Sequence, residues 1–204
     1  MTGKEKLIFS ENYITLKGHG ERHTIMHVGE TEYMKKLAEI VTKNGGDILE
    51  IGFGMHISAD FIQSNPKVTS HTIIEVHPEI YERALEWSKN RPNTKIILGD
   101  WIDILPLINS KFDGIFYDPY NDYNYEKFLN HVSENCKNGT IVGFYDYPLF
   151  DLRLNGIRVK IEDNDLETIP FRHLKEFSGN QYEIKYTTFD GNYFYRQKEI
   201  KNII

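Results

Sequence analysis

The sequence has little of three features that would each indicate a particular class of protein. It contains one cysteine, Cys136, in 204 residues, so an internal disulfide is impossible and we expect a reducing compartment, the cytoplasm. It has no apolar run of the roughly 18–20 residues that a membrane span needs, so we expect no membrane partner. It also has no excess of positive charge. The net charge of −6 argues against a nucleic-acid partner and suits a small or cationic one.

Internal repeats and low-complexity tracts are absent as well. At this length we expect a single domain over residues 1–204, in which 1–45 form an N-terminal cover and helix and 46–204 form the core. Within residues 1–45, the pattern at 14–16 predicts either a short strand or part of the cover. We expect the protein to be a monomer or a homodimer.

Three histidines in the N-terminal part, His19, His23 and His27, invite comparison with a metal site. No acid or cysteine stands with them at the spacing of zinc ligands. We therefore expect no metal.

The chain alternates short apolar strands with helices, which is the pattern of a parallel sheet. Strands are expected at 47–51, 70–76, 95–98, 112–118 and 140–145, and helices at 31–44, 56–63, from 78 to about 90, from 101 to about 109 and near 124–136. The end of the chain differs, because 182–188 and 193–200 flank the turn signal Asp190-Gly191. This pattern predicts an antiparallel hairpin that closes an otherwise parallel sheet.

Acidic residues stand at the ends of the expected strands, where ligands bind in such sheets. Glu50 lies in the first strand just before Gly52-Phe53-Gly54-Met55, and Asp118 ends the fourth. Glu75 ends the second strand, 21 residues after Gly54. That spacing suits a carboxylate that accepts both ribose hydroxyls of a bound nucleoside.

The glycine loop lacks the third glycine of Gly-x-Gly-x-x-Gly, because residue 57 is Ile. This disfavours NAD or FAD, and the absence of a Gly-x-x-x-x-Gly-Lys-[Ser/Thr] motif disfavours a phosphate-cradling loop. A nucleoside without phosphates fits better, and S-adenosylmethionine is the common one, with S-adenosylhomocysteine as its product. Asp100 would then bind the exocyclic amine of adenine, and Trp101 would stack on the base or contact it through its backbone. The expected cofactor-binding residues are Glu50, Gly52, Gly54, Met55, Glu75, Val76, Asp100, Trp101 and Asp118.

Several motifs together resemble the guanidinoacetate N-methyltransferases and their arginine-methylating relatives. The segments concerned are 28–34 (Val-Gly-Glu-Thr-Glu-Tyr-Met), 49–55 (Leu-Glu-Ile-Gly-Phe-Gly-Met), 73–75 (Ile-Ile-Glu) and 112–118 (Phe-Asp-Gly-Ile-Phe-Tyr-Asp). The resemblance runs from about residue 25 to 145 and returns at 193–195. It implies an α/β fold of the Rossmann-like class I methyltransferases, with a seven-stranded, mostly parallel sheet, a C-terminal antiparallel hairpin and helices on both faces.

The resemblance also implies an S-adenosylmethionine-dependent N-methyltransferase, in which the Glu of Glu-Thr-x-Tyr-Met and the Asp of Tyr-Asp hold the guanidino group of the acceptor. Here these are Glu30 and Asp118, the expected catalytic residues. We expect Asp118 to be the base nearest the attacking nitrogen and Glu30 to be a second clamp. The expected substrate-binding residues are Glu30, Tyr33, Met34, Asp118, Tyr120, Tyr145 and Asp146. The acceptor would be a guanidino compound, arginine or an arginine-containing peptide.

Three alternatives stay open from the sequence. An amine or peptide N-terminal methyltransferase of natural-product modification would share the carboxylates. A nucleobase-amine methyltransferase is suggested by Asp118-Pro119-Tyr120, which resembles the Asp-Pro-Pro-Tyr motif of such enzymes without one proline. A domain that binds S-adenosylmethionine as a structural or sensing ligand would not need the acceptor-side acids.

Overall fold

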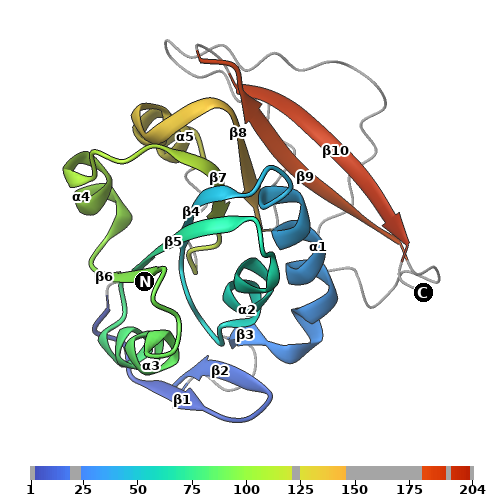
Figure 1. Cartoon of the computed structure of the whole chain (residues 1–204). Coiled ribbons are helices and arrows are strands. Elements are labelled where there is room, and N and C mark those ends of the chain that lie inside the picture. Colours follow the sequence, from blue (N-terminus) through green and yellow to red (C-terminus); the bar gives the residue numbers. More distant parts are fainter. Residues whose placement is uncertain (1–2, 19–23, 121–124, 146–180, 192–193, 203–204) are drawn as a thin grey trace.

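The structure, a computed structural model, describes residues 3–18, 24–120, 125–145, 181–191 and 194–202 (Figure 1). His19, His23 and Asp146, which the sequence analysis singled out, lie outside these ranges. Within the described ranges, every helix is too short or too polar to cross a lipid bilayer. The same ranges hold no group of three or more His, Cys, Asp or Glu side chains that could bind a metal ion.

The main sheet has the strand order β10-β9-β8-β7-β4-β5-β6. Its strands are β4 (Gly46–Ile51), β5 (Val68–Glu75), β6 (Thr94–Leu98), β7 (Phe112–Tyr117), β8 (Cys136–Phe144), β9 (Gln181–Phe189) and β10 (Phe194–Asn202). The strands from β4 to β8 pair in parallel, whereas β9 is antiparallel to both β8 and β10. The predicted mostly parallel α/β sheet with a C-terminal antiparallel hairpin is therefore confirmed. The strand order reverses between β4 and β7, and such a switch point leaves a crevice beyond the carboxyl ends of the strands.

Helices cover both faces of this sheet (Figure 1). One face carries α1 (Thr31–Val41), α2 (Ile57–Ser64) and α3 (Pro78–Ser88), and the other carries α4 (Trp101–Ile104), η3 (Leu105–Leu107), α5 (Tyr125–Val132) and η4 (Ser133–Asn135). The alternation of side chains along β4 explains this arrangement. Ile48 packs with α1, whereas Leu49 and Ile51 pack with the α4 and α5 side. Both faces of β4 are therefore buried, as a central parallel strand requires.

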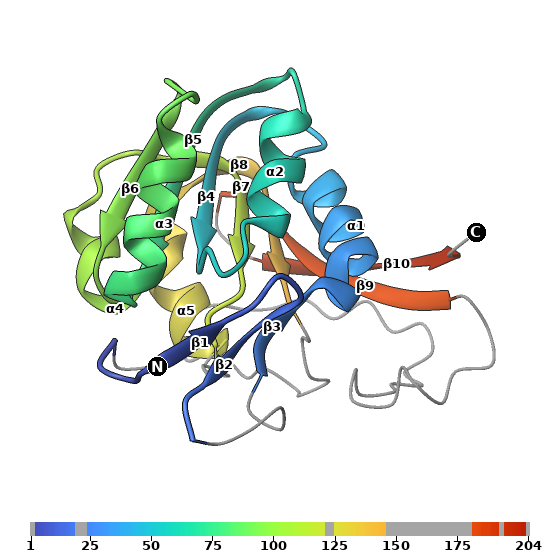
Figure 2. The ribbon, with the colours of Figure 1, turned by 90° about the horizontal axis from the view of Figure 1, so that it is seen from below.

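The N-terminal part adds a small antiparallel sheet of β1 (Leu7–Phe9), β2 (Tyr13–Leu16) and β3 (Thr24–His27). Only β2 was anticipated, as one of two possibilities. Figure 2 shows this sheet lying across the end of the main sheet toward which the arrowhead of β4 points. A short helix, η2 (Val28–Glu30), connects β3 directly to α1. The small sheet thus covers the edge at which the sequence predicts ligand binding.

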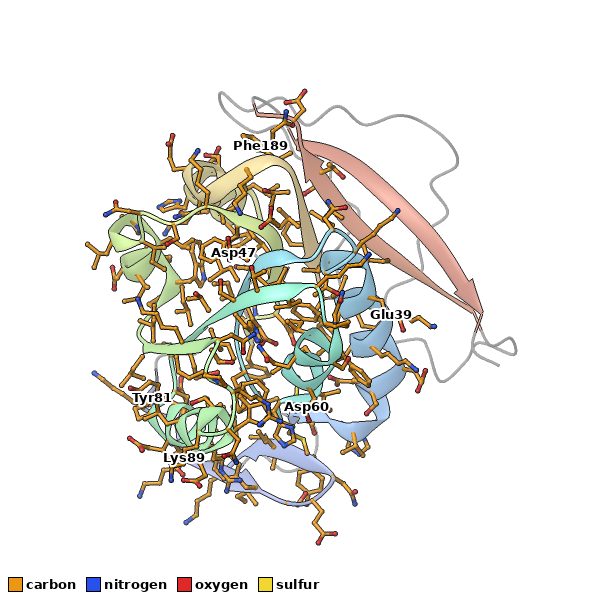
Figure 3. The ribbon with its side chains drawn as sticks, viewed as in Figure 1. Glu39, Asp47, Asp60, Tyr81, Lys89 and Phe189 are labelled. Carbon is orange, nitrogen blue, oxygen red and sulfur yellow. The ribbon has the colours of Figure 1, made fainter. Side chains whose placement is uncertain are left out.

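A network of charged side chains stabilises the opposite side of the main sheet, where the parallel strands begin. We call this side the amino edge, and the side where the strands end the carboxyl edge. Asp47, labelled in Figure 3, lies at the amino end of β4. Lys137 donates from Nζ to Asp47 Oδ2 at 2.9 Å and to Asp113 Oδ2 at 2.7 Å. Ser70 Oγ also donates to Asp47, at 2.7 Å. These contacts join the beginnings of β4, β5, β7 and β8.

Candidate functional site

The glycine loop that follows β4 lies directly against Asp118. Gly52 and Gly54 have positive φ angles of 89° and 52°, which glycine adopts without steric cost. A Cβ atom at Gly52 would lie 2.5 Å from the carbonyl oxygen of Asp118, so only glycine fits there. The backbone N–H of Asp118 donates to the carbonyl of Ile51 at 3.0 Å. The predicted cofactor loop and the backbone of the predicted acceptor-binding residue Asp118 are therefore neighbours.

Glu75, at the end of β5, holds the same loop from the other side. Its Oε2 accepts the backbone N–H of Phe53 at 2.9 Å, and its Oε1 accepts that of His77 at 2.7 Å. The residue is 3% exposed, and burial raises the pKa of its carboxyl. The backbone N–H of Val76 also donates to this carboxylate. Since a carboxylate offers about four acceptor positions, about one remains for a ligand such as a ribose. Val76 follows and is partly exposed.

Glu30 is the last residue of η2 and directly precedes α1. Its carboxylate accepts hydrogen bonds from the Tyr145 hydroxyl and from the backbone of His27. Burial outweighs both contacts and raises the pKa of Glu30 to about 7. At neutral pH this carboxyl is therefore close to its midpoint of ionisation.

Asp118 is the second carboxyl group of this cluster. Its pKa lies well above the ordinary value, first because of burial and then because of the negative charges of Glu30, Glu50 and Glu75. Among the described residues, neither Glu30 nor Asp118 takes part in an ion pair with a Lys or Arg. The described part of the site thus concentrates carboxyl groups with raised pKa values, which is a common property of functional sites.

Two tyrosines complete the cluster. The rings of Tyr33 and Tyr145 meet edge to face, with centroids 5.3 Å apart. The Tyr33 hydroxyl donates to the carbonyl of Phe144 at 3.3 Å. Burial and the nearby charges of Glu30 and Asp118 raise the pKa of Tyr145. The structure therefore brings together four of the predicted substrate-binding residues, from η2, α1 and the ends of β7 and β8.

Other predicted residues have their side chains engaged within the protein. Glu50 is fully buried, accepts a hydrogen bond from Ser58 and has its Oε2 2.9 Å from Nε2 of His71. Its carboxylate therefore joins β4 to α2 and β5 beneath the glycine loop. Trp101 and Met34 are 4% and 1% exposed and lie in the two main hydrophobic clusters.

The remaining predicted residues lie at the edges of the site. Asp100 accepts the backbone N–H of Ile102 at 3.0 Å and so caps α4, as short acidic side chains commonly do. Met55 donates its backbone N–H to Sδ of Met26 at 3.0 Å. Tyr120 is partly exposed.

Three residues that support the glycine loop were not predicted from the sequence: Met26, Ser58 and His71. His71 had a recognisable signal, since a histidine in the middle of a central, β-branched strand is a buried polar group that needs a partner. Met26 had none, because its contact with the loop depends on how β3 lies across the main sheet.

Comparison with known proteins gives a consistent picture. The sequence profile of the family described as guanidinoacetate N-methyltransferase matches residues 10–144, more than half of the chain. Protein arginine N-methyltransferase 2 of Candida glabrata is 35% identical over 136 residues, which are 61% of this chain and 32% of that protein. The enzyme of the same name from Saccharomyces cerevisiae is 33% identical over 116 residues, 52% of this chain and 28% of that protein. The chain thus spans about a third of the length of these relatives.

Among solved structures, the S-adenosylhomocysteine-bound methyltransferase PaMTH1 of Podospora anserina superimposes with a TM-score of 0.49 and 21% identity. The superposition covers 57% of this chain and 52% of that protein.

Proposed function

The chain belongs to the guanidinoacetate N-methyltransferase family, and from this premise we propose that it transfers a methyl group from S-adenosylmethionine to a guanidino nitrogen. The acceptor would be arginine, an arginine-containing peptide or a small guanidino compound. The observation that carries the proposal is the pair of carboxyl groups, Glu30 and Asp118, which have no cationic partner among the described residues and lie beside the glycine loop.

The residues around the glycine loop fit the proposed cofactor. Gly52 keeps the loop free of a side chain next to Asp118, Gly54 does so next to Met26, and Glu75 retains an acceptor position for a ribose hydroxyl. Val76 and the backbone around Asp100 and Trp101 would contact the base. We leave Met34 and the carboxylate of Glu50 out of the direct contacts, because both are buried within the protein. When bound, S-adenosylmethionine supplies the electrophilic methyl group of its sulfonium.

The paired carboxyl groups suit a guanidinium for two reasons. A planar guanidinium donates parallel hydrogen bonds that match carboxylates, and its positive charge favours their ionised forms. Binding of such a cation would therefore lower the pKa values that burial has raised. Tyr145 would keep Glu30 in place through its hydroxyl, and Tyr33 would support the ring of Tyr145.

Asp118 has the further task of taking a proton. A protonated guanidinium has no usable lone pair, so it must lose a proton as its nitrogen attacks the methyl carbon. We assign this proton to Asp118, which lies next to the glycine loop. Holding the acceptor in line can lower the barrier by roughly 7–11 kcal/mol, and the base would add a smaller factor.

Methyl uptake from labelled S-adenosylmethionine tests this proposal. The panel should contain guanidinoacetate, free arginine, Arg-peptides, their Lys-substituted counterparts, simple amines and oligonucleotides. We expect label only on guanidino compounds. Label on the amines or Lys-peptides alone would favour an amine methyltransferase, and label on oligonucleotides alone would reject the guanidino assignment.

A further inference from the structure

The thioether of Met26 fills the space beside the glycine loop. Met26 lies on β3 and is 4% exposed. Its Sδ accepts the backbone N–H of Met55 at 3.0 Å. A Cβ atom at Gly54 would lie 2.6 Å from this sulfur and 3.0 Å from Cε of the same side chain. Met26 therefore joins the small N-terminal sheet to the loop both by packing and by a hydrogen bond, and Ile14 of β2 adds a hydrophobic cluster shared with Phe53.

The same short segment carries Glu30, only four residues further along the chain. The residues between them are tied to one another. His27 accepts the backbone N–H of Gly29 on Nδ1 at 2.8 Å, which caps η2. The carboxylate of Glu30 in turn hydrogen-bonds to the backbone of His27. A displacement of Met26 would therefore also displace Glu30.

We propose that Met26 is a positioning residue that couples the state of the glycine loop to the position of Glu30. Under this proposal, which rests on the proposed function, a ligand that fixes residues 52–55 also fixes Met26. The acceptor carboxylate is then held in its place beside Asp118. Coupling of this kind requires that the ligand favour one of two arrangements of the loop, and typical coupling between sites is about 5- to 150-fold.

The alternative role for Met26 is to fill a gap in the core, as methionine often does. Two substitutions separate the roles. Met26→Leu keeps most of the volume but removes the sulfur acceptor, and Met26→Ala removes both. Ile40→Ala is the matched control, because Ile40 is 5% exposed in the same hydrophobic cluster but lies in the last part of α1, away from Glu30.

Amide hydrogen exchange with and without S-adenosylhomocysteine tests the proposal without an acceptor. In the unmodified protein we expect the ligand to slow exchange at 52–56 and also, by at least about fivefold, at 28–30. Met26→Ala should keep the first effect and lose the second, whereas Ile40→Ala should keep both. In the ligand-free state, the Met55 amide should exchange faster in Met26→Leu than in the unmodified protein.

The outcomes separate this inference from the proposed function. If S-adenosylhomocysteine leaves 52–56 of the unmodified protein unchanged, the proposed cofactor is wrong and the inference falls with it. If 52–56 respond but 28–30 do not, or if 28–30 respond equally in Met26→Ala, the cofactor stands and the coupling role of Met26 is wrong. If Met26→Ala fails to fold, Met26→Leu is measured in its place. A response at 28–30 equal to that of the unmodified protein would then show that the coupling role of Met26 is wrong.

Discussion

The two edges of the main sheet use acidic side chains in opposite ways. At the amino edge, Asp47 and Asp113 share the ammonium group of Lys137. Hydrogen bonds from Ser70 and Lys137 lower the pKa of Asp47. At the carboxyl edge, Glu30 and Asp118 share no cation within the described residues, and burial raises the pKa of both.

This difference distinguishes two kinds of acidic residue: those that stabilise the fold, and those that we propose bind a cationic ligand. A carboxylate paired with a lysine contributes to folding when it is ionised. A buried carboxyl without a cation opposes folding when it is ionised, so its presence calls for another explanation. The proposed guanidinium acceptor is that explanation, and the predictions below test it by altering one edge at a time.

The largest effect is expected from Asp118→Asn. This change keeps the shape of the side chain but removes the proposed base, so turnover should fall by about 10²- to 10⁴-fold. The melting temperature should stay equal or rise, because a carboxyl whose ionisation is opposed by burial and by neighbouring carboxylates has been removed. Steady-state methyl transfer and thermal unfolding measure the two quantities.

Asp113→Asn is the matched control for that change, since it alters an acid at the other edge. It weakens the contacts of Asp113 with Lys137 and with the backbone N–H of Asp47, so stability should fall while turnover is retained. Turnover of Asp118→Asn equal to that of the unmodified protein would show that Asp118 is not the base.

A smaller effect is expected in the pH dependence of stability. The pKa of Glu30 is raised from 4.5 to about 7, so between these values the folded chain keeps a proton that the unfolded chain has lost. The protonated carboxyl of Glu30 therefore stabilises the fold at low pH. This contribution to the free energy of unfolding, on the order of 3 kcal/mol, is lost as the pH rises toward 7. Urea unfolding at several pH values should show this slope.

Glu30→Gln should remove this pH-dependent loss, whereas Glu39→Gln, at an exposed position of α1, should leave it. In the unmodified protein the KM of a guanidino acceptor should also fall as the pH rises through about 7, because a cation binds better to ionised carboxylates. A slope that persists in Glu30→Gln would assign the titration to another group.

Much of the main sheet could be predicted because its evidence is local. The apolar runs that form β4, β5 and β7 are separated by helices with one apolar face, and this pattern needs no knowledge of distant contacts. The acids at the strand ends follow from the same pattern. Once the strands are parallel, their carboxyl ends must lie at one edge.

The N-terminal sheet and the support of the glycine loop were not predictable in this way. The strands β1 to β3 have three or four residues each and pair across a part of the chain without periodicity. Met26 acquires its role only when β3 crosses the end of the main sheet. The burial of Glu50 could have been inferred, because it shares a face of β4 with Ile48, which packs beneath α1.

The smallest effect is expected from Lys137→Met at the amino edge. The substitution keeps the apolar length of the side chain but leaves Asp47 and Asp113 without their shared cation. Since the Lys137 side chain is 38% exposed, solvent screens these contacts, and the loss of stability should be about 1 kcal/mol. Turnover should stay within about twofold, because a contact at this edge supplies no group to the transition state.

The pH dependence of this loss should have the opposite sign to that at Glu30. The pKa of Asp47 is lowered from 3.8, so its contribution to stability is present above that value and disappears as the pH falls through the folded-state pKa. The unfolding free energies of Lys137→Met and the unmodified protein should therefore differ at pH 7 and converge in acid. If Lys137→Met instead lowered turnover as strongly as Asp118→Asn, the acids of the amino edge would also serve the reaction, and the two edges would not be functionally distinct.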